Sequence, residues 1–279
     1  MQTILITGSG GFVGKNLKEY FNDKFSLLTP RSYELDCTNI KDVEKYFKSN
    51  NIDFIIHCGN VGGAREIQDK DTTIEENLLM VENLLKFKNS DTKIILFGSG
   101  AMYGKANPIK KVNENELDSK IPTDLYGESK KQIAQKIMQR KDCVCLNIFG
   151  CYGKYEKESR FPTYAIKQNI AKKPIIINQN VIFDYLYIED LIKIIEYFLF
   201  ITPKNNIINV TPTKSISLFE IAQIVNKISN FESEIIIKEP TMGNEYTGDN
   251  ARLKAEMPNL NFTPYEIGLK KLYKFLATN

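Results

Sequence analysis

The sequence predicts an α/β fold in which a doubly wound parallel sheet is joined to a smaller C-terminal α/β lobe. A short apolar run, Ile4-Leu5-Ile6, breaks directly into the glycine-rich turn of residues 7–14. Short apolar runs then alternate with helical patterns up to about residue 150, which indicates parallel strands joined by right-handed crossovers. Beyond that residue the alternation of strand and helix patterns becomes less regular. We therefore predict a dinucleotide-type domain over residues 1–150 and a substrate lobe over residues 151–279, from which segments can return to the sheet.

The elements of the first half follow from their own patterns. The continuous apolar run of residues 52–57 is expected of a strand that is covered on both faces. One helix is predicted to begin with a capping box made by Thr72 and Glu75. Its apolar face comprises Ile74, Leu78, Val81 and Leu85. The other predicted elements are a helix after the glycines, strands at 25–28, 93–97 and 143–148, and helices around 43–47 and 124–140.

The second half is less regular. Helices are predicted around residues 164–171 and 191–200, and strands around 175–177 and 182–187. The polar stretch of residues 105–121 has no apolar periodicity. It is either a loop that lies over the entrance of the substrate site or a surface loop without a functional role. Because the sequence shows no repeat or low-complexity linker, the C-terminal part is expected to pack on the first domain.

Composition excludes several classes of protein. The 279 residues are 42% hydrophobic and 25% charged, as in globular proteins, and a net charge of +3 gives no reason to expect nucleic-acid binding. The most apolar late segment, residues 191–201, is too short to span a membrane. The five cysteines lack metal-ligand spacing, and Cys143 and Cys145 should face the same side of a strand. Since the N-terminus also lacks a signal-peptide pattern, we expect a cytoplasmic protein without a metal.

The glycines of the first turn predict a dinucleotide site. Gly8 suits a sharp turn after the strand, Gly11 lets backbone N–H groups approach a pyrophosphate, and Gly14 lets the helix pack close to the sheet. The helix begins at Phe12 and Val13, and its N-terminus faces the phosphates with unpaired donors. These five residues are the first predicted cofactor contacts. The alternative is a plain turn between a strand and a helix.

A possible catalytic group lies later in this half. Tyr126 and Lys130 are four residues apart on a predicted helix, so both project from one face. An ammonium beside a phenol favours the phenolate, which would lower the tyrosine pKa from about 10 and let it exchange a proton with a substrate oxygen. Ser99 ends the preceding strand at the carboxyl edge of the sheet and could bind the same oxygen. Surface packing and a turn serine are the alternatives.

Together these residues resemble the extended short-chain dehydrogenase/reductases. The resemblance rests on the glycine spacing, Ser99, the Tyr126/Lys130 pair, Met-Tyr-Gly at 102–104 and residues 185–190, and it covers almost the whole chain. It implies a Rossmann-type fold and an NAD(P)-dependent epimerase, dehydratase or reductase of nucleotide sugars. Within this group, residues 29–36 and 61–63 are most like the GDP-fucose synthases, which are 4-keto-sugar epimerase-reductases.

The resemblance also implies further roles. Cofactor contacts are expected at Asp36, Cys37 and Gly59, although Asp36 could equally cap the next helix. Val61 is an expected substrate contact, and Lys130 is expected to hold the nicotinamide ribose. A homodimer is expected, built from the two helices that carry residues 74–85 and 126–140.

Departures from the family restrict the chemistry. The 4,6-dehydratases carry an Asp-Glu pair where Gly100 and Ala101 stand, so dehydration is not expected. The fucose synthases epimerise with a cysteine and a histidine; Ala101 replaces the cysteine, and an approximate alignment places Arg160 at the histidine. The single histidine, His57, ends a buried strand and is expected to be a core residue. Hydride transfer is thus retained while epimerisation beside the ketone is lost.

Substrate and cofactor recognition are also altered. The family arginine that meets the sugar-nucleotide diphosphate is Phe183 here, so Arg160, Lys167 or Arg252 must bind that group, or the substrate differs. An acid at the end of the second strand would favour NAD, but Arg31 stands there and offers a fork for the 2′-phosphate of NADP. We therefore favour NADP over NAD; a solvent-facing arginine without a ligand is the alternative.

Three functions are compatible with these residues. The first is a reductase that uses NADPH on a 4-keto group of a nucleotide-activated deoxy sugar. The second is a 4-epimerase or dehydrogenase that keeps NAD bound, because the same three residues serve both reactions. The third is a non-catalytic nucleotide sensor of the same fold, which the retention of Ser99, Tyr126 and Lys130 disfavours.

Overall fold

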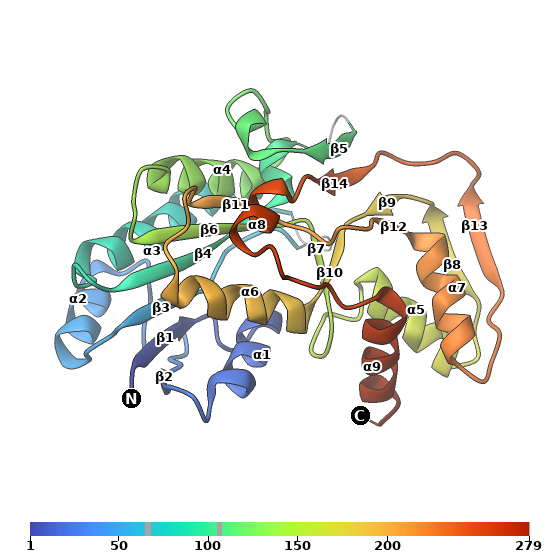
Figure 1. Ribbon diagram of the computed structural model, residues 1–279, viewed down its shortest axis with the longest axis horizontal. Coiled ribbons are helices and arrows are strands. Elements are labelled where there is room, and N and C mark those ends of the chain that lie inside the picture. Colours follow the sequence, from blue (N-terminus) through green and yellow to red (C-terminus); the bar gives the residue numbers. More distant parts are fainter. Residues whose placement is uncertain (65–67, 105–107, 279) are drawn as a thin grey trace.

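The structure is a computed structural model that describes residues 1–64, 68–104 and 108–278. A parallel six-stranded sheet forms the larger part of the molecule (Figure 1). Its spatial order is β2 (Ser26–Leu28), β1 (Thr3–Thr7), β3 (Phe54–His57), β4 (Lys93–Ser99), β6 (Cys143–Ile148) and β11 (Ile207–Val210). The order of the strands in the sheet reverses direction between β1 and β3. Open α/β sheets bind ligands at the carboxyl ends of the strands next to such a reversal. The predicted fold class is confirmed.

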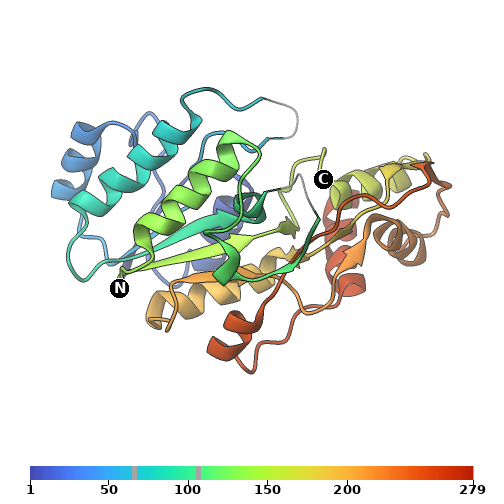
Figure 2. The ribbon, with the colours of Figure 1, turned by 90° about the horizontal axis from the view of Figure 1, so that it is seen from above.

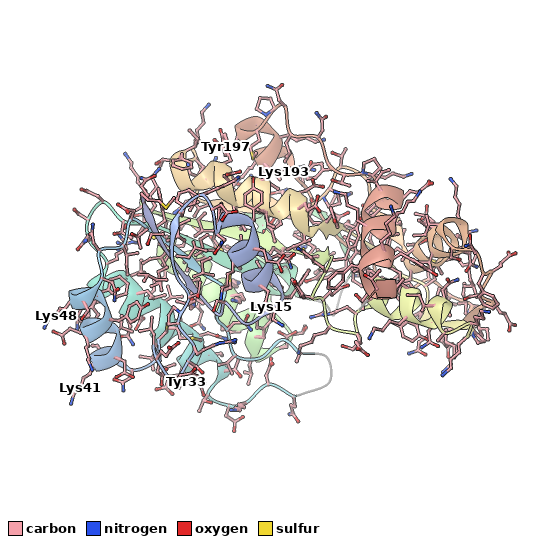
Figure 3. The ribbon with its side chains drawn as sticks, turned by 90° about the horizontal axis from the view of Figure 1, so that it is seen from below. Lys15, Tyr33, Lys41, Lys48, Lys193 and Tyr197 are labelled. Carbon is pink, nitrogen blue, oxygen red and sulfur yellow. The ribbon has the colours of Figure 1, made fainter. Side chains whose placement is uncertain are left out.

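Helices cover both faces of this sheet, as Figure 2 shows from above. The helices α1 (Phe12–Phe21) and α6 (Ile188–Phe200) pack on one face, and α2 (Ile40–Ser49), α3 (Thr73–Phe87) and α4 (Leu125–Ile137) pack on the other. Figure 3 views the first face, with Lys15 on α1 and Lys193 on α6. In β1, Ile4 and Ile6 join the core under α1 while Leu5 joins the core under α3, because successive strand residues point to opposite faces.

Later segments build a second, smaller unit at the carboxyl end of the sheet, on the right in Figure 1. It contains the helices α5 (Phe161–Ile170), α7 (Leu218–Ile228) and α9 (Tyr265–Thr278) and the parallel pair β8 (Ile175–Gln179) and β13 (Ile235–Glu239). A second parallel pair is β7 (Gly150–Tyr152) with β10 (Tyr185–Tyr187). The short helix α8 (Ala251–Glu256) returns to β11. From beyond residue 150, β11 joins the large sheet and α6 packs on it, as segments that return to the first unit. The division at residue 150 stays a prediction.

A four-stranded sheet joins the two units. Its order is β12 (Ile216–Ser217), β9 (Ile182–Phe183), β14 (Tyr246–Gly248) and β5 (Ile109–Val112). Strand β5 and the turn η2 (Glu114–Glu116) lie within the stretch predicted as a loop over residues 105–121; Lys105 to Asn107 of that stretch lie outside the described residues. A second turn, η1 (Gly100–Tyr103), follows β4.

The helix α3 differs in part from its prediction. Thr72 makes no capping bond through its side chain and instead donates its hydroxyl to Glu76, so the predicted capping box is absent. The buried side of α3 runs through Thr73, Asn77, Met80, Val81, Asn83 and Leu84; of the predicted apolar stripe, Ile74, Leu78 and Leu85 are only half-buried. These outer leucines pack at the edge of the core, because polar Asn77 and Asn83 are drawn inward by hydrogen bonds to loops.

Two element boundaries also differ from expectation. The strand predicted over residues 182–187 is broken at Asp184, whose buried carboxylate accepts hydrogen bonds from Ser215 Oγ at 2.6 Å and Gly248 N at 2.9 Å. The helix predicted over 124–140 ends at Ile137. Cys143 and Cys145 are buried in the same core cluster, which confirms that they face one side. Within the described part of the chain, no helix has the length and apolar character needed to cross a membrane.

Candidate active site

The glycine turn lies at the carboxyl ends of β1 and β3. Gly8 has φ +67°, and a Cβ there would lie 2.6 Å from Gly59 N, so the backbone of the next strand leaves room for glycine alone. A Cβ on Gly14 would lie 2.5 Å from Gly8 O, which brings α1 against the turn. Gly11 N donates to Gly8 O at 3.0 Å, and no side chain caps the start of α1. The turn therefore presents free backbone donors, with Gly59 beside it, as an anion site requires.

Residues after β2 border this turn. The exposed Arg31 lies beside Gly10, because a Cβ on Gly10 would collide with its guanidinium. Asp36 accepts hydrogen bonds from Thr38 N at 2.9 Å and Thr38 Oγ1 at 2.7 Å, and Asn39 caps α2 instead. The alternative helix-capping role of Asp36 is thus wrong. The Cys37 thiol is buried, and burial raises its pKa to about 12.

Ser99, Tyr126 and Lys130 meet where β4 ends against α4. Asp124 fixes the start of α4 by accepting from Gly127 N at 2.6 Å, which places Tyr126 in the first turn and Lys130 one turn later. Ser99 ends β4, and it lies close enough to Tyr126 to lower the pKa of that phenol. Lys130 Nζ lies 5.4 Å from the centroid of the Tyr126 ring. The structure thus brings the three predicted residues together.

Burial decides the protonation of this group. It raises the pKa of Tyr126 to about 12, against the opposing effects of nearby Ser99 and of the Arg160 charge. It also lowers the pKa of Lys130 to about 8. The expected lowering of the Tyr126 pKa is therefore wrong for this arrangement, since desolvation raises that pKa. A phenol that stays protonated near neutral pH is the form that donates a proton to a carbonyl oxygen.

The loop after β3 covers the Tyr126 ring. Gly63 has φ +74°, and a Cβ there would lie 3.0 Å from ring atoms of Tyr126. Asp69 joins the two segments by accepting from Gly63 N at 2.9 Å and from Tyr126 N at 2.8 Å. Asn77 holds Val61 through both of its backbone groups, at 2.8 and 2.9 Å. Asp69 and Asn77 were not predicted, because nothing in their local sequence shows which backbone groups they will meet.

A second tyrosine reaches the catalytic serine. Tyr246 belongs to β14, and Ser99 lies close enough to lower the pKa of its phenol. A Cβ on Gly100 would lie 2.5 Å from Tyr246 Oη and 2.6 Å from Phe149 Cδ1, so these side chains fill the space beside Gly100. The sequence offered only a weak signal here, a likeness of residues 243–250 to a family segment near the nucleotide.

Comparison with known proteins identifies the family. The model of the NAD dependent epimerase/dehydratase family matches residues 4–211, which contain the glycine turn, Ser99, Tyr126 and Lys130. The chain belongs to this family. It is accordingly an NAD(P)-dependent oxidoreductase, as predicted.

Individual relatives are more distant. A GDP-L-colitose synthase from Yersinia pseudotuberculosis is 30% identical, over 60% of this chain and 60% of that protein. A probable GDP-L-fucose synthase from Drosophila melanogaster is 22% identical, over 100% of this chain and 98% of that protein. The solved structure of a GDP-mannoheptose C4 reductase from Campylobacter jejuni, with NADP bound, has a TM-score of 0.81 and 19% identity over 99% of this chain and 98% of that one. This last likeness shows the shared fold.

The three cations considered for the diphosphate, and Phe183 in place of the family arginine, have different surroundings. Arg160 precedes α5, and its charge lowers the pKa of both Tyr126 and Tyr246, so it lies near the catalytic group. Lys167 forms an ion pair with Glu158. Phe183, where the family has arginine, packs against Tyr185 and Tyr246 with ring centroids 5.3 and 5.7 Å apart.

Arg252 is not brought to this group. Its guanidinium donates to Ile207 O at 3.1 Å and to Asn115 Oδ1 at 2.5 Å, and it lies 3.5 Å from Glu114 Oε2. Ile207 begins β11, at the end of the sheet opposite the ligand edge. The predicted substrate contact is thus wrong, because α8 directs this side chain to the amino end of β11.

His57 is a core residue, as expected. Its Nδ1 lies 2.6 Å from Thr7 Oγ1, and only 5% of the residue is exposed. Burial lowers its pKa to about 3, with Lys130 adding to the effect. The imidazole therefore stays neutral at physiological pH.

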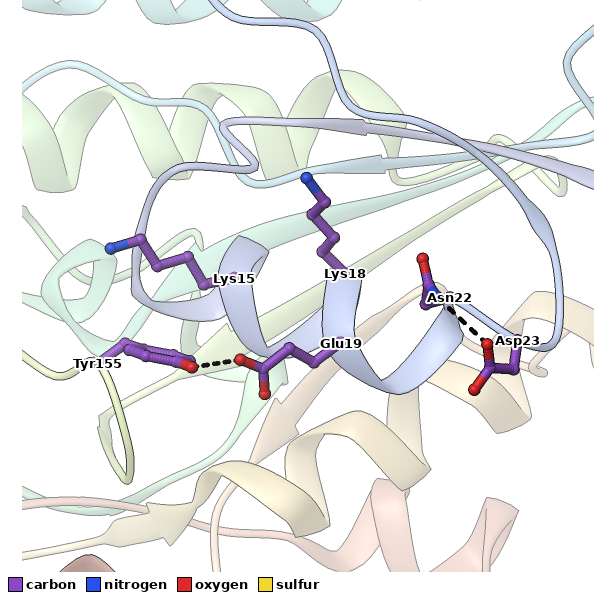
Figure 4. Close-up of a pocket in the computed structure, with 6 residues that line it drawn as sticks. All are labelled: Lys15, Lys18, Glu19, Asn22, Asp23 and Tyr155. Atoms are coloured by element: carbon purple, nitrogen blue, oxygen red, sulfur yellow. Dashed lines mark hydrogen bonds between the residues drawn. The ribbon is translucent and has the colours of Figure 1, made fainter. Parts of the chain in front are cut away.

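A surface hollow lies apart from this site. Its volume is about 570 Å³. Figure 4 shows it beside α1, with the hydrogen bond between Tyr155 and Glu19 as a dashed line. The lining residues are Lys15, Lys18, Glu19, Asn22, Asp23 and Tyr155. None of them was predicted as a site residue. Among the residues that the structure describes, no group of three or more His, Cys, Asp or Glu is arranged to hold a metal ion.

Proposed function

We propose that this protein reduces the 4-keto group of a nucleotide-activated deoxy sugar with NADPH, without dehydration and without epimerisation at neighbouring carbons. The observation that carries the proposal is the meeting of Ser99, Tyr126 and Lys130 where β4 ends against α4, at the edge of the sheet that also carries the glycine turn. Relatives named as GDP-L-colitose and GDP-L-fucose synthases support a nucleotide sugar as substrate.

The cofactor site fits a phosphorylated dinucleotide. Gly8, Gly11 and Gly14 leave a cradle that Cβ atoms would fill, and its free N–H groups would hold the pyrophosphate. Arg31, exposed beside Gly10, would bind the 2′-phosphate, which favours NADP over NAD. Phe12, Val13, Asp36, Cys37 and Gly59 are proposed to line the remaining cofactor surface. When bound, NADPH supplies the hydride.

The protein supplies the proton and its direction. Tyr126 donates its phenolic proton to the ketone oxygen, and Ser99 stabilises the same oxygen by a hydrogen bond. Lys130 is proposed to hold the nicotinamide ribose. Val61 is a proposed substrate contact beside the loop that covers Tyr126, and Arg160 and Lys167 are the proposed diphosphate contacts.

Side reactions lack their usual groups. Gly100 and Ala101 carry no ionisable side chain where dehydratases have two acids, and both are buried. The space beside Gly100 is filled by Tyr246 and Phe149. A proton on a carbon beside the ketone therefore meets no carboxylate or thiolate from these two positions.

A panel of substrates tests the proposal. The purified protein is incubated with NADPH or NADH and with GDP-, dTDP- or UDP-linked 4-keto-6-deoxyhexoses, and cofactor absorbance is followed. Consumption of NADPH with at least one ketone is expected. Running the reaction in deuterium oxide should leave the carbons beside the carbonyl without deuterium; labelling there would contradict the absence of epimerisation.

The alternative 4-epimerase keeps NAD bound, so releasing and identifying any dinucleotide in the purified protein separates the two functions. Tightly held NAD, with interconversion of sugar epimers and no net NADPH use, would favour the epimerase. A homodimer through the outer faces of α3 and α4 is part of the proposal. Light scattering of the purified protein tests it, and a monomeric mass would contradict it.

A further inference from the structure

We propose that Asp69 is a positioning residue that holds the proton donor Tyr126 in place against the Val-Gly-Gly segment, which comprises residues 61–63 after β3. The inference rests on the proposed reductase function, because it concerns how Tyr126 is oriented for that reaction. Nothing in the sequence around Asp69 marks it as a site residue. Its role follows from the two backbone groups that its carboxylate binds.

The Asp69 carboxylate connects the segment to Tyr126 through its two oxygens. Oδ1 accepts from Gly63 N at 2.9 Å, and Oδ2 accepts from Tyr126 N at 2.8 Å. A carboxylate carries only acceptors, so it suits two N–H groups at once, and its charge strengthens both hydrogen bonds. An amide at the same place has one acceptor oxygen. A single ionised side chain therefore fixes the distance between the segment and Tyr126.

The hydrogen bond to Tyr126 is made at the start of α4. The first N–H groups of a helix have no partner within the helix. Asp124 accepts from Gly127 N at 2.6 Å, and Asp69 accepts from Tyr126 N although it lies 57 positions away in the chain. The helix dipole also favours a negative charge at this end. Because Tyr126 lies in the first turn of α4, a displacement of the helix start would displace its ring.

The two glycines of the Val-Gly-Gly segment match the groups that they face. Gly62 has φ +83°, and a Cβ there would lie 2.6 Å from Asp69 Oδ1. Gly63 has φ +74°, and a Cβ there would lie 3.0 Å from ring atoms of Tyr126. A side chain at either position would push against the carboxylate or against the ring. The segment thus packs closely on both Asp69 and Tyr126.

A second set of hydrogen bonds ties the same segment to the carbonyl group of Tyr126. Asn77 Nδ2 donates to Val61 O at 2.9 Å and to Ser129 Oγ at 3.0 Å. Asn77 Oδ1 accepts from Val61 N at 2.8 Å, and Ser129 Oγ donates to Tyr126 O at 2.8 Å. Both backbone groups of Tyr126 are thus linked to the Val-Gly-Gly segment, one of them through Asp69.

The two connections differ in burial. Asn77 and Ser129 are 2% and 0% exposed, whereas Asp69 is half-buried. Loss of the buried connection would leave polar groups unsatisfied in the core, which destabilises the fold. Water reaches Asp69, so its removal should act chiefly on the placement of Tyr126. Since Val61 is the proposed substrate contact, this placement sets the distance from the proton donor to the ketone.

Asp69→Asn tests this role with little change of shape. The amide accepts from only one of the two N–H groups, and we expect kcat to fall about tenfold to a hundredfold, because a displaced proton donor reacts far more slowly. The KM for NADPH should not change, since the glycine turn is untouched. The matched control is Asp71→Asn, which removes the same charge two residues away. Asp71 is exposed, and its side chain makes no hydrogen bond or ion pair with another described residue, so kcat should be unaltered.

Three results of these assays contradict the proposal. The first is a wild-type kcat in Asp69→Asn, and the second is an equal loss of kcat in Asp71→Asn. The third is a KM for NADPH that rises as much as kcat falls, because it would mean a general loosening of the site rather than a displaced Tyr126. The substrate is the ketone of the panel that is reduced fastest.

Amide hydrogen exchange separates this inference from the proposed function, because it needs no substrate. In Asp69→Ala, which removes both acceptors, the amides of Gly63 and Tyr126 should exchange about tenfold faster than in the wild type. In Asp71→Ala both rates should be unchanged. Unchanged rates in Asp69→Ala would overturn the role of Asp69. Faster exchange in a protein that reduces no ketone of the panel would overturn only the reductase function.

Discussion

The ligand edge of the large sheet and the C-terminal lobe contribute to one site by different means. Gly8, Ser99 and Tyr126 sit where a strand ends or a helix begins, so their positions follow from local geometry. Arg160 and Tyr246 reach the same place from the lobe, the latter across a sheet of four short strands. The sheet edge thus supplies the catalytic and cofactor-binding residues, and the local sequence specifies their positions. The lobe supplies surroundings that only long-range pairing can place.

The largest effect should come from the sheet edge itself. Tyr126→Phe removes the proton donor, and we expect kcat to fall about a thousandfold. NADPH affinity, measured by cofactor fluorescence, should stay within about twofold of the wild type, since a single neutral hydroxyl is lost. Undiminished turnover would break the assignment of chemistry to this edge.

Cofactor choice should depend on one side chain next to the glycine turn. Arg31→Ala is expected to weaken NADPH binding about tenfold to a hundredfold, because a charge-assisted contact to the 2′-phosphate is lost. NADH binding should be unaltered, which serves as the internal control. Equal losses for both dinucleotides would show that Arg31 is structural.

Two arginines of the C-terminal half sharpen the comparison. Arg160→Gln should raise the KM for the nucleotide sugar about tenfold, because it removes a cation whose charge lowers the pKa of both site tyrosines. Arg252→Gln should leave that KM unchanged and instead lower the free energy of unfolding by about 1–2 kcal/mol, since buried Glu114 and Ile207 O lose a partner. Substrate titrations and chemical unfolding of both variants measure these two effects. The reverse pattern would mean that Arg252 binds the substrate and that Arg160 stabilises the fold.

The smallest effect concerns stability at the sheet edge. Burial lowers the pKa of Lys130 to about 8 from the usual 10.5, so near neutral pH the fold holds a charge that water would solvate better. Lys130→Met should therefore raise the melting temperature at about pH 7, although turnover is lost. The wild type should recover stability as pH rises from about 8 toward 10.5, because there the unfolded chain binds more protons than the folded one.

Thermal unfolding of both proteins at about pH 7 and about pH 10 measures this difference. If the difference in melting temperature between Lys130→Met and the wild type grows with pH, the assigned protonation of Lys130 is contradicted. If that difference becomes smaller as pH rises, the charged form of Lys130 destabilises the fold near neutral pH.

Local patterns predicted most of the first half of the chain. The run Ile4-Leu5-Ile6 with Gly8 gave a strand and a turn, and β1 and α1 follow there. Predictions that depended on a capping pattern were weaker. Thr72 could bond backbone or Glu76 at similar cost, and the structure has the latter.

By itself, the sequence determined the parallel sheet, the glycine cradle and the placing of Ser99, Tyr126 and Lys130, because each depends on contacts within a few residues or on one strand-to-helix step. Only the tertiary structure decided that Arg252 supports β11, that burial holds Tyr126 protonated and that Tyr246 stands beside Ser99. Desolvation depends on everything packed around a group. The partners of Tyr246 lie on β5 and β9, more than 60 residues away in the chain, at a distance that no local pattern can encode.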